Sequence, residues 1–320
     1  MICSQTIDKI KGCLYGQAVG DALGLGAEFL TKDQVSKFYP NGVSKYEDII
    51  QDRHRKRWIK GSWTDDTDMM LCILDAFDGR EFNIRKVAQN FKDWADGEPL
   101  GIGLHTQKVL FMGDYVDKPF DCSSLWWEVS RRQSAANGAV MRTSVIGCEL
   151  NNVGIQAEQI AKLTHYDPRC VGSCVIVSEI IHNLIWKNKE LSYNDIQEIG
   201  KKYDERIFDW VYVAHRGTLD DLDLDNENEM GYTLRTLAAG LWVYFHSEDF
   251  ISGLKAIVNE GGDADTNGAV AGAILGAKFG LRAIPEYYVQ NLNNQILFEQ
   301  KVAGFIAKLN NKVANFGSDI

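Results

Sequence analysis

The sequence predicts an all-α protein, and two observations carry that prediction. Only 5 prolines occur in 320 residues, so few positions interrupt a helix. Apolar residues recur at three- and four-residue spacing over long stretches, whereas the period-two alternation of half-buried strands is hard to find. Neither a repeat nor a Pro/Ser-rich linker divides the chain, so we expect one helical domain over residues 1–320. The helices are expected over residues 67–77, 87–95, 104–111, 155–163, 171–186, 232–245 and 298–309.

One further helix is expected where glycine recurs every fourth residue, in the segment GAVAGAILGAKFG. Gly268, Gly272, Gly276 and Gly280 would place a bare backbone stripe on one helix face, which lets another helix approach closely. The same spacing occurs in membrane-helix dimers, but this apolar stretch stops at Lys278 after about half of a membrane-spanning length. We therefore expect a buried core helix.

Composition narrows the class of partner. Hydrophobic residues make up 45% of the chain, which is ample for a core, and 34 Lys and Arg face 44 Asp and Glu. The formal charge of −10 argues against binding nucleic acid by general electrostatics and favours cationic partners or metal ions. Seven cysteines without a C-x-x-C pair predict neither a disulfide framework nor a zinc site. We expect a cytoplasmic monomer that does not bind membranes.

Two polar stretches break the helical pattern, and both are expected to be surface loops. The basic run RHRKR covers residues 53–57, and gripping a phosphate or nucleic acid is the alternative interpretation for it. The acidic run DDLDLDNENE covers residues 220–229 and begins like a calcium-binding EF-hand loop. It fails that pattern because Asn226 stands where the loop needs Gly and Tyr232 where it needs Glu.

The first segment with chemical content is GSWTDDTDMML, where Thr64, Asp65 and Asp66 precede an apolar helix. Helix capping is the simplest explanation, because such residues satisfy the free N–H groups of a first turn. Capping needs only one or two such residues, however. Thr-Asp-Asp-Thr-Asp supplies five together, and the negative charges of its aspartates repel one another. This excess predicts that something positively charged binds there.

The second segment, GGDADTNGAVAGAILGA, repeats the pattern nearly in reverse. Asp263, Asp265 and Thr266 again stand at a helix start, after two glycines that permit unusual backbone angles. If the two helix starts meet, four carboxylates and two threonine oxygens converge. Such hard oxygen ligands select Mg²⁺, Mn²⁺ or Ca²⁺ over zinc or copper. Because four carboxylates balance two divalent ions, we expect a paired metal site.

The order and spacing of six segments resemble the ADP-ribosylglycohydrolase family, the group of dinitrogenase-reductase-activating glycohydrolases and ADP-ribosyl-acceptor hydrolases. These segments are GCLYGQAVGDALGLGAEF, GSWTDDTDMML, SAANGAVMR, THYDPRC, GYTLRTLAAGLW and GGDADTNGAVAGAILGA. The resemblance runs nearly end to end. It implies a compact all-α enzyme with a binuclear Mg²⁺ or Mn²⁺ centre that removes ADP-ribose from a modified acceptor.

The resemblance also implies roles for single residues. The metal ligands would be Thr64, Asp65, Asp66, Asp263, Asp265 and Thr266. Glu28 matches a family glutamate beside the metals, so Glu28, Asp66 and Asp265 are the candidate catalytic residues, with an exposed loop acid as the alternative for Glu28. Asp21 we interpret as structural.

On the substrate side, Ser134, Asn137 and Gly138 match a family loop that receives the phosphate or ribose part of ADP-ribose. A helix is expected to begin directly after this loop and to offer N–H donors to a diphosphate. His165 and Tyr232 are further candidate substrate contacts, each weighed against a packing role. The segment THYDP departs from the family's Thr-His-x-His-Pro pattern because Asp167 replaces the second histidine.

The expected reaction is hydrolysis of the glycosidic bond of ADP-ribosyl-arginine on a protein, through a transition state with oxocarbenium character. A serine or other acceptor is the alternative within the family. A non-catalytic member that binds ADP-ribose, and a phosphohydrolase that uses paired metals, are the alternatives from other classes.

Overall fold

The computed structural model describes residues 1–316, and the predicted all-α class is confirmed: no β-strand occurs in this range, only two isolated β-bridges. The α-helices are α1 (Ser4–Gly24), α2 (Lys32–Phe38), α3 (Asp65–Asp75), α4 (Ile84–Asp96), α5 (Leu104–Leu110), α6 (Pro119–Val129), α7 (Ser144–Gly147), α8 (Val153–Lys162), α9 (Pro168–His182), α10 (Tyr193–Gly200), α11 (Arg206–Arg216), α12 (Thr233–His246), α13 (Phe250–Val258), α14 (Ala264–Phe279), α15 (Glu286–Gln290) and α16 (Gln295–Phe316). Short 3₁₀ turns cover η1 (Tyr46–Asp48), η2 (Arg55–Arg57), η3 (Val140–Arg142), η5 (Asp220–Leu222) and η6 (Leu281–Ala283), and η4 (Asn183–Lys187) is a π-helical turn.

Every helix predicted from apolar periodicity has a counterpart, whereas the long helix α1 and several shorter helices were not predicted. The predicted ranges overlap α3, α4, α5, α8, α9, α12 and α16, and the glycine-rich segment forms α14. Three of the missed helices start from capping signals. α2 and α10 each begin with a capping box, at Thr31 and Ser192, and Asp249 caps α13. Periodicity over a long window does not register such local signals.

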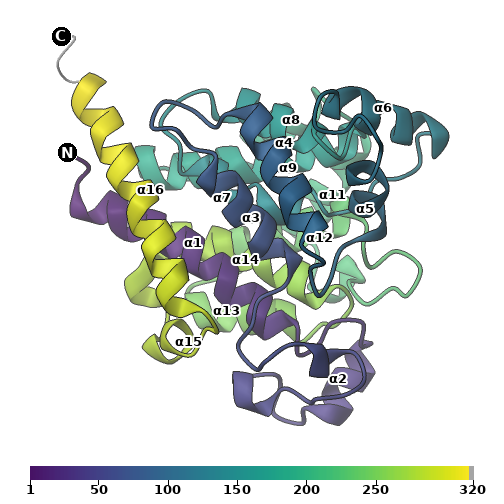
Figure 1. The fold of residues 1–320 in the computed structure, drawn as a ribbon. Coiled ribbons are helices and arrows are strands. Elements are labelled where there is room, and N and C mark those ends of the chain that lie inside the picture. The colour runs from purple at the N-terminus through teal and green to yellow at the C-terminus, as the bar shows by residue number, and fades with distance from the viewer. Residues whose placement is uncertain (317–320) are drawn as a thin grey trace.

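The centre of the fold is an antiparallel pair formed by α1 and α14, which run side by side through the molecule (Figure 1). Glycines on both helices face each other: Gly12 meets Gly276, Gly16 meets Gly272, and Gly20 meets Gly268. A Cβ atom added at Gly272 would lie 2.1 Å from the carbonyl oxygen of Gly16. The two backbones are therefore in direct contact, as the glycine stripe predicts. Gly280 differs from that prediction, because it ends α14 with φ of 85°.

The antiparallel register brings the C-terminal end of α1 to the N-terminal start of α14. The turn after α1 is pinned there, because the N–H of Phe29 donates to the carbonyl of Gly262 and the N–H of Gly262 donates to Leu30. Gly261 and Gly262 both have positive φ, at 76° and 68°, which confirms their expected unusual backbone. Glu28 and Asp263 are thereby brought into one region.

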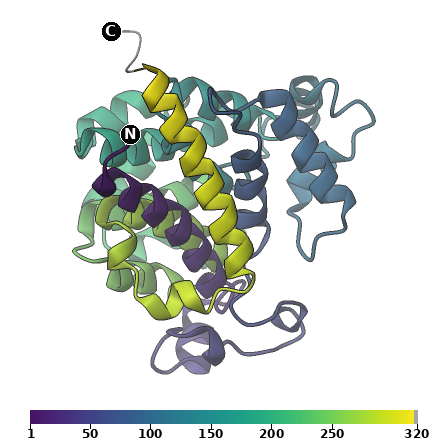
Figure 2. The same cartoon turned by 60° about the vertical axis from the view of Figure 1, so that its left-hand side comes forward.

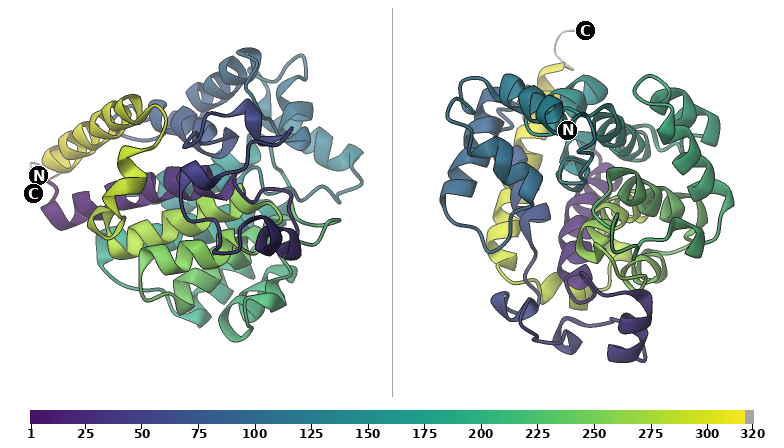
Figure 3. Two further views of the ribbon diagram at one scale, coloured as in Figure 1. Left: turned by 90° about the horizontal axis from the view of Figure 1, so that it is seen from below. Right: turned by 90° about the vertical axis from the view of Figure 1, so that its right-hand side faces the viewer.

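The remaining helices surround this pair. α16 packs along α1, where Phe298 contacts Tyr15 with ring centroids 4.8 Å apart, and both ends of the described chain lie on the same side of the molecule (Figure 2). The segment around α2 lies at one end (Figure 3). Buried apolar side chains from Ile2 to Leu309 form one contiguous cluster, so the described residues make up a single compact domain, and residues 317–320 of the expected domain 1–320 lie outside them.

The segment from Pro168 to Lys187 is, by length and composition, apolar enough to cross a membrane. Most of it is buried inside the protein, as in the core helix of a soluble protein. Cys170 and Cys174 on this helix are free and buried.

Replacing Gly272 with Ala should destabilise the protein by about 3 kcal/mol or more, because the new methyl group forces the backbones of α1 and α14 apart. Chemical denaturation measures this loss. Gly304→Ala is the matched control: a Cβ there meets nothing within 4 Å, so the substitution should stabilise exposed α16 by about 0.5–1 kcal/mol. Equal effects at both positions would contradict the backbone contact.

Candidate functional site

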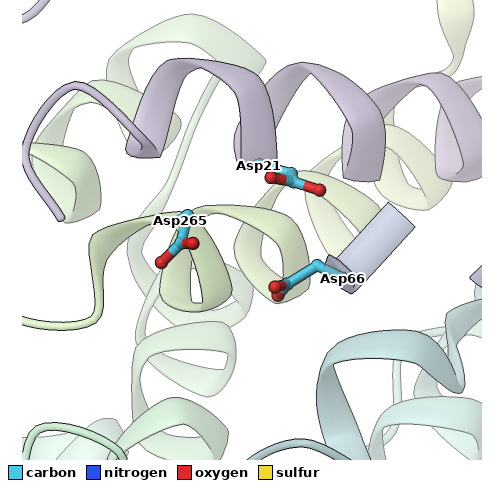
Figure 4. A group of neighbouring side chains, drawn as sticks. All are labelled: Asp21, Asp66 and Asp265. Atoms are coloured by element: carbon cyan, nitrogen blue, oxygen red, sulfur yellow. The ribbon is translucent and has the colours of Figure 1, made fainter. Parts of the chain in front are cut away.

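The two predicted acidic clusters meet at the end of the α1–α14 pair. Asp66 stands in the first turn of α3, Asp265 in the first turn of α14, and Asp21 in the last turn of α1. Figure 4 shows these three carboxylates facing a common space between the three helices. One oxygen from each lies within 4.8 Å of the others, a geometry that a metal ion can bridge.

Asp21 organises the start of α3, as its structural interpretation expects. Its two carboxylate oxygens accept four hydrogen bonds, from the backbone N–H and the hydroxyl of Thr64 and from the same two groups of Thr67. Asp21 is fully buried and thereby fixes where the Thr64–Asp66 segment lies. Its carboxylate also faces Asp66 and Asp265, so it borders the acidic site as well.

The capping explanation for the acidic clusters fails. Thr64 and Asp263 occupy the N-cap positions of α3 and α14, yet neither makes a side-chain capping hydrogen bond. The Thr64 hydroxyl oxygen instead lies 3.1 Å from Asp66 and 3.4 Å from Asp265. One oxygen each of Asp66 and Asp265 is buried without any hydrogen-bond partner. Buried carboxylate oxygens without hydrogen-bond donors can be satisfied by a bound cation.

A second acidic group adjoins the first. Glu28, Asp263 and Asp265 also bring one oxygen each within 4.8 Å of one another, so Asp265 belongs to both groups. Asn137 donates to Asp263 over 2.7 Å and to the hydroxyl of Thr236 over 3.0 Å, which fixes the Asp263 carboxylate. Two adjoining groups that share one carboxylate are the arrangement that two neighbouring cations need.

Burial shapes the acid–base behaviour of these carboxyl groups. It raises the pKa of Asp65 to about 7 and that of Asp263 to about 6, and the nearby charge of Glu28 adds to both shifts. Burial, together with neighbouring carboxylates, also raises the pKa of Asp66 and Asp265 well above the ordinary range. Burial likewise raises the pKa of Asp21 to about 8. Among the ion pairs of residues 1–316, none joins a Lys or Arg to these five groups.

The donor set therefore fits hard divalent cations. The candidate ligands Thr64, Asp65, Asp66, Asp263, Asp265 and Thr266 all lie around one cavity of about 300 Å³. Oxygen donors of this kind suit Mg²⁺, Mn²⁺ or Ca²⁺.

The basic run 53–57 lies in a surface loop, as expected, with Arg53, Lys56 and Arg57 exposed, but Arg55 departs from that expectation. Arg55 is buried and donates to the carbonyls of Leu25, Gly26 and Glu28, so it clamps the turn that carries Glu28. The reason is local: this turn exposes carbonyls that no helix bond satisfies, and a guanidinium group has enough donors to take several of them. Charge patterning alone does not reveal such a partner.

Two further members of the run approach the acidic site. His54 Nε2 lies 2.6 Å from a carboxylate oxygen of Glu28, and Arg57 donates to His54 Nδ1 over 2.7 Å. Because a guanidinium only donates, Nδ1 accepts and Nε2 carries the hydrogen that Glu28 receives. The Arg57 guanidinium lies 4.4 Å from the ring centroid of Trp58, at the wall of the cavity. Glu28 is thus buried and held, which excludes the exposed-acid alternative.

Three of the five predicted substrate residues line the same cavity, namely Asn137, Gly138 and His165. His165 is fully buried, and its ring stacks on His105 with centroids 4.0 Å apart. A cavity of this size and shape, with charged groups at its base and glycines in its wall, is suited to a small-molecule ligand.

Ser134 and Tyr232 do not line the cavity. Ser134 instead lies 2.6 Å from His105 Nδ1 and so supports a residue that does. Tyr232 is the N-cap residue of α12, and the Arg169 guanidinium lies over its ring at 5.5 Å. The helix expected directly after Gly138 is also wrong: the chain forms the 3₁₀ turn Val140–Arg142 there, and the short helix α7 begins only at Ser144.

Asp167, which replaces the second histidine of the family's Thr-His-x-His-Pro pattern, has a structural role. It caps α9 through the N–H of Arg169 and forms a bidentate ion pair with the guanidinium of the same residue, at 2.8 and 2.7 Å. The indole N–H of Trp127 donates to it as well. A fully partnered carboxylate is unavailable for proton transfer or ligand binding.

Six further residues line the cavity that sequence patterns did not assign to a site: Phe29, His54, Arg57, Trp58, His105 and Thr106. His54 and Arg57 belong to the basic run, and His105 and Thr106 lie in a helix predicted from apolar periodicity. Neither pattern shows which of its side chains face the cavity.

The fold and site define a class: an all-helical protein with buried acidic groups at two helix starts beneath a small-molecule cavity. The family model described as ADP-ribosylglycohydrolase matches residues 3–315. The chain therefore belongs to the ADP-ribosylglycohydrolase family, and it is a hydrolytic enzyme of the ADP-ribosyl glycohydrolase type.

Two curated relatives are similar over most of their length. The ADP-ribosylarginine hydrolase Tri1 of Serratia proteamaculans is 25% identical over 306 residues, covering 91% of this chain and 77% of the relative. The ADP-ribosyl-[dinitrogen reductase] glycohydrolase of Rhodospirillum rubrum is 26% identical over 306 residues, covering 90% and 92%. A solved structure described as an ADP-ribosylglycohydrolase-related protein complex superposes with a TM-score of 0.75 at 24% identity, covering 96% of this chain and 100% of that one.

The metal-free protein should lose stability as pH rises from about 4 to about 8. The folded pKa values of Asp65, Asp263 and Asp21 lie above the unfolded value of about 3.9, so the folded state binds more protons in this window. Thermal unfolding in chelator at pH 5 and pH 8 measures the decline. Saturating Mg²⁺ should flatten it by neutralising the carboxylates, and equal declines with and without Mg²⁺ would contradict cation binding at this site.

Proposed function

We propose that this protein is a metal-dependent hydrolase that cleaves the glycosidic bond between ADP-ribose and a modified acceptor, most favourably ADP-ribosyl-arginine on a protein. The observation that supports it most is the pair of acidic groups sharing Asp265, with unpartnered oxygens, at the base of a cavity lined by Asn137, Gly138 and His165. Two divalent cations, Mg²⁺ or Mn²⁺, are the proposed cofactors, held by Thr64, Asp65, Asp66, Asp263, Asp265 and Thr266.

In the proposed reaction, the bond between the anomeric carbon and the acceptor breaks, water adds to that carbon, and the acceptor leaves with a proton. Bound divalent cations supply charge neutralisation and polarise the oxygens that they contact. Glu28 is the candidate for handling the proton, because it borders the acidic site and His54 fixes its orientation over 2.6 Å. Asp66 and Asp265 remain candidates for the same step, since each has a free carboxylate oxygen facing the site.

Arginine is the proposed acceptor because the relative from Serratia proteamaculans is named for ADP-ribosylarginine. The net charge of −10 also favours basic target segments. Serine or another acceptor is the alternative. A binding protein without catalysis is disfavoured by the intact acidic groups, and a phosphohydrolase differs in its products. A cytoplasmic location, a monomeric state and the absence of nucleic-acid and membrane binding remain predictions.

Free ADP-ribose should be released from ADP-ribosyl-arginine peptides in Mg²⁺ or Mn²⁺ and not in chelator, because the carboxylates need cations to accept the substrate. Chromatography of the products measures the release, with ADP-ribosyl-serine peptides as the parallel acceptor. Release of AMP or inorganic phosphate would instead indicate phosphoryl chemistry. Tight binding of ADP-ribose with no product from either peptide would indicate a binding protein.

Two substitutions should separate cation binding from proton handling. Asp265→Ala removes a carboxylate shared by both acidic groups, so metal-dependent turnover should fall by about a thousandfold or more and the stabilisation by Mg²⁺ should disappear. Glu28→Gln keeps the shape of the side chain, so Mg²⁺ should still stabilise the protein while kcat falls by about a hundredfold or more. Wild-type turnover in Asp265→Ala would refute the binuclear site, and unchanged kcat in Glu28→Gln would remove Glu28 from the reaction.

A further inference from the structure

Arg142 is a fully buried cation without a carboxylate partner. Its guanidinium lies over the ring of Phe91 at 4.3 Å, approaches the sulfur of Met69 at 3.4 Å and donates to the hydroxyl oxygen of Thr164 at 2.5 Å. Among the ion pairs of residues 1–316, none involves Arg142. Burying a charge without a counter-ion is costly, so its retention calls for a function beyond packing.

Thr164 passes the effect of Arg142 to His165. The Thr164 hydroxyl oxygen has two neighbours: the Arg142 guanidinium, which only donates, and His165 Nδ1 at 2.7 Å. The hydroxyl hydrogen therefore has one acceptor in reach, which is Nδ1. The opposite tautomer, with hydrogen on Nδ1, would leave the hydroxyl hydrogen buried without an acceptor. The network thus places the ring hydrogen of His165 on Nε2.

The Nε2 atom of His165 is buried and has no hydrogen-bond partner among the described residues. It borders the cavity beside Gly138, where an added Cβ would lie 3.2 Å from it. A buried donor without a partner at the wall of a cavity lacks an acceptor, which a ligand that fills the cavity supplies. The lack of a partner for Nε2 does not depend on the contacts that Arg142 makes, so it points to a ligand contact independently of them.

The ring of His165 is also fixed in orientation. It stacks on His105 at 4.0 Å with 14° between the planes. His105 is held at both nitrogens, by Ser134 at 2.6 Å and by the carbonyl of Thr164 at 2.9 Å. Burial lowers the pKa of His105 to about 4 and lowers the pKa of His165 well below its ordinary value, so both rings are neutral near pH 7.

We propose that Arg142 and Thr164 are positioning residues that hold His165 as an Nε2–H donor toward an acceptor oxygen of the substrate. The identity of that substrate rests on the proposed function, whereas the hydrogen-bond chain does not. In this arrangement His165 orients the substrate and transfers no proton. Arg142 thereby acts on the cavity without lining it.

The test compares Thr164→Val, which keeps the shape but loses the hydroxyl, with Thr164→Ser, which keeps both hydrogen bonds. Thr143→Val is the matched control, because its buried hydroxyl donates to the carbonyl of Val140 instead. NMR of ¹⁵N-histidine-labelled protein reports the tautomer of each of the six histidines, and His165→Gln assigns the signal. Calorimetry measures the affinity of each variant for free ADP-ribose. Steady-state kinetics with the cleaved peptide give kcat and KM.

Wild type, Thr164→Ser and Thr143→Val should show hydrogen on Nε2 of His165. Thr164→Val should show a changed tautomer signature and about tenfold weaker ADP-ribose binding, which appears in KM more than in kcat. Arg142→Met should likewise free the Thr164 hydroxyl to accept from Nδ1–H, so both tautomers appear. If Arg142→Met fails to fold, the comparison of Thr164→Val with Thr164→Ser tests the proposal.

Hydrogen on Nδ1 in the wild type would overturn the proposal, as would an unchanged tautomer and ADP-ribose affinity in Thr164→Val. These results are separate from failure of the proposed function. A protein that cleaves neither peptide yet shows the expected tautomers and affinity differences would support the positioning role and refute only the proposed reaction.

Discussion

The contact between the backbones of α1 and α14 is the constraint on which the rest of the structure depends. Helix axes come this close only where both partners lack side chains, and here glycine faces glycine at three successive turns. The backbone hydrogen bonds between the turn after α1 and the start of α14, from Phe29 to Gly262 and from Gly262 to Leu30, fix the register of this pairing. Because the register is fixed, so is the position of the last turns of α1 against the first turn of α14.

This fixed register holds together a site whose carboxylates repel one another. Asp21, Asp66 and Asp265 face one another from three different helices, and each is almost fully buried. Their mutual repulsion and their burial oppose folding until cations or protons neutralise them. A loosely packed scaffold would relieve that strain by moving apart. Here Asp21 is tied to α3 by four hydrogen bonds and α1 is locked to α14, so the carboxylates stay together.

The sequence predicted the parts of the site that lie close together along the chain. Each acidic cluster occupies a few consecutive residues at a helix start, and the glycine stripe has a helical period, so composition and spacing reveal both. The orienting residues could not be found this way. Arg55, Arg142 and His105 act through hydrogen bonds to carbonyl and hydroxyl oxygens that lie 22 to 59 positions away in the chain. The burial of Arg55 within RHRKR was missed for the same reason, because the charge pattern of the run is that of a solvated loop.

The cavity also shows how arginine prepares neutral donors. His54 and His165 both line the cavity, and in each case a guanidinium, directly or through Thr164, leaves Nδ1 only an accepting role. Nε2 then must donate, toward Glu28 in one case and into the cavity in the other. A protonated imidazole would compete with cations for the carboxylates and would repel the arginine behind it. For His165, whose arginine does not line the cavity, fixing the tautomer in this way supplies a directional N–H group without adding positive charge to the wall.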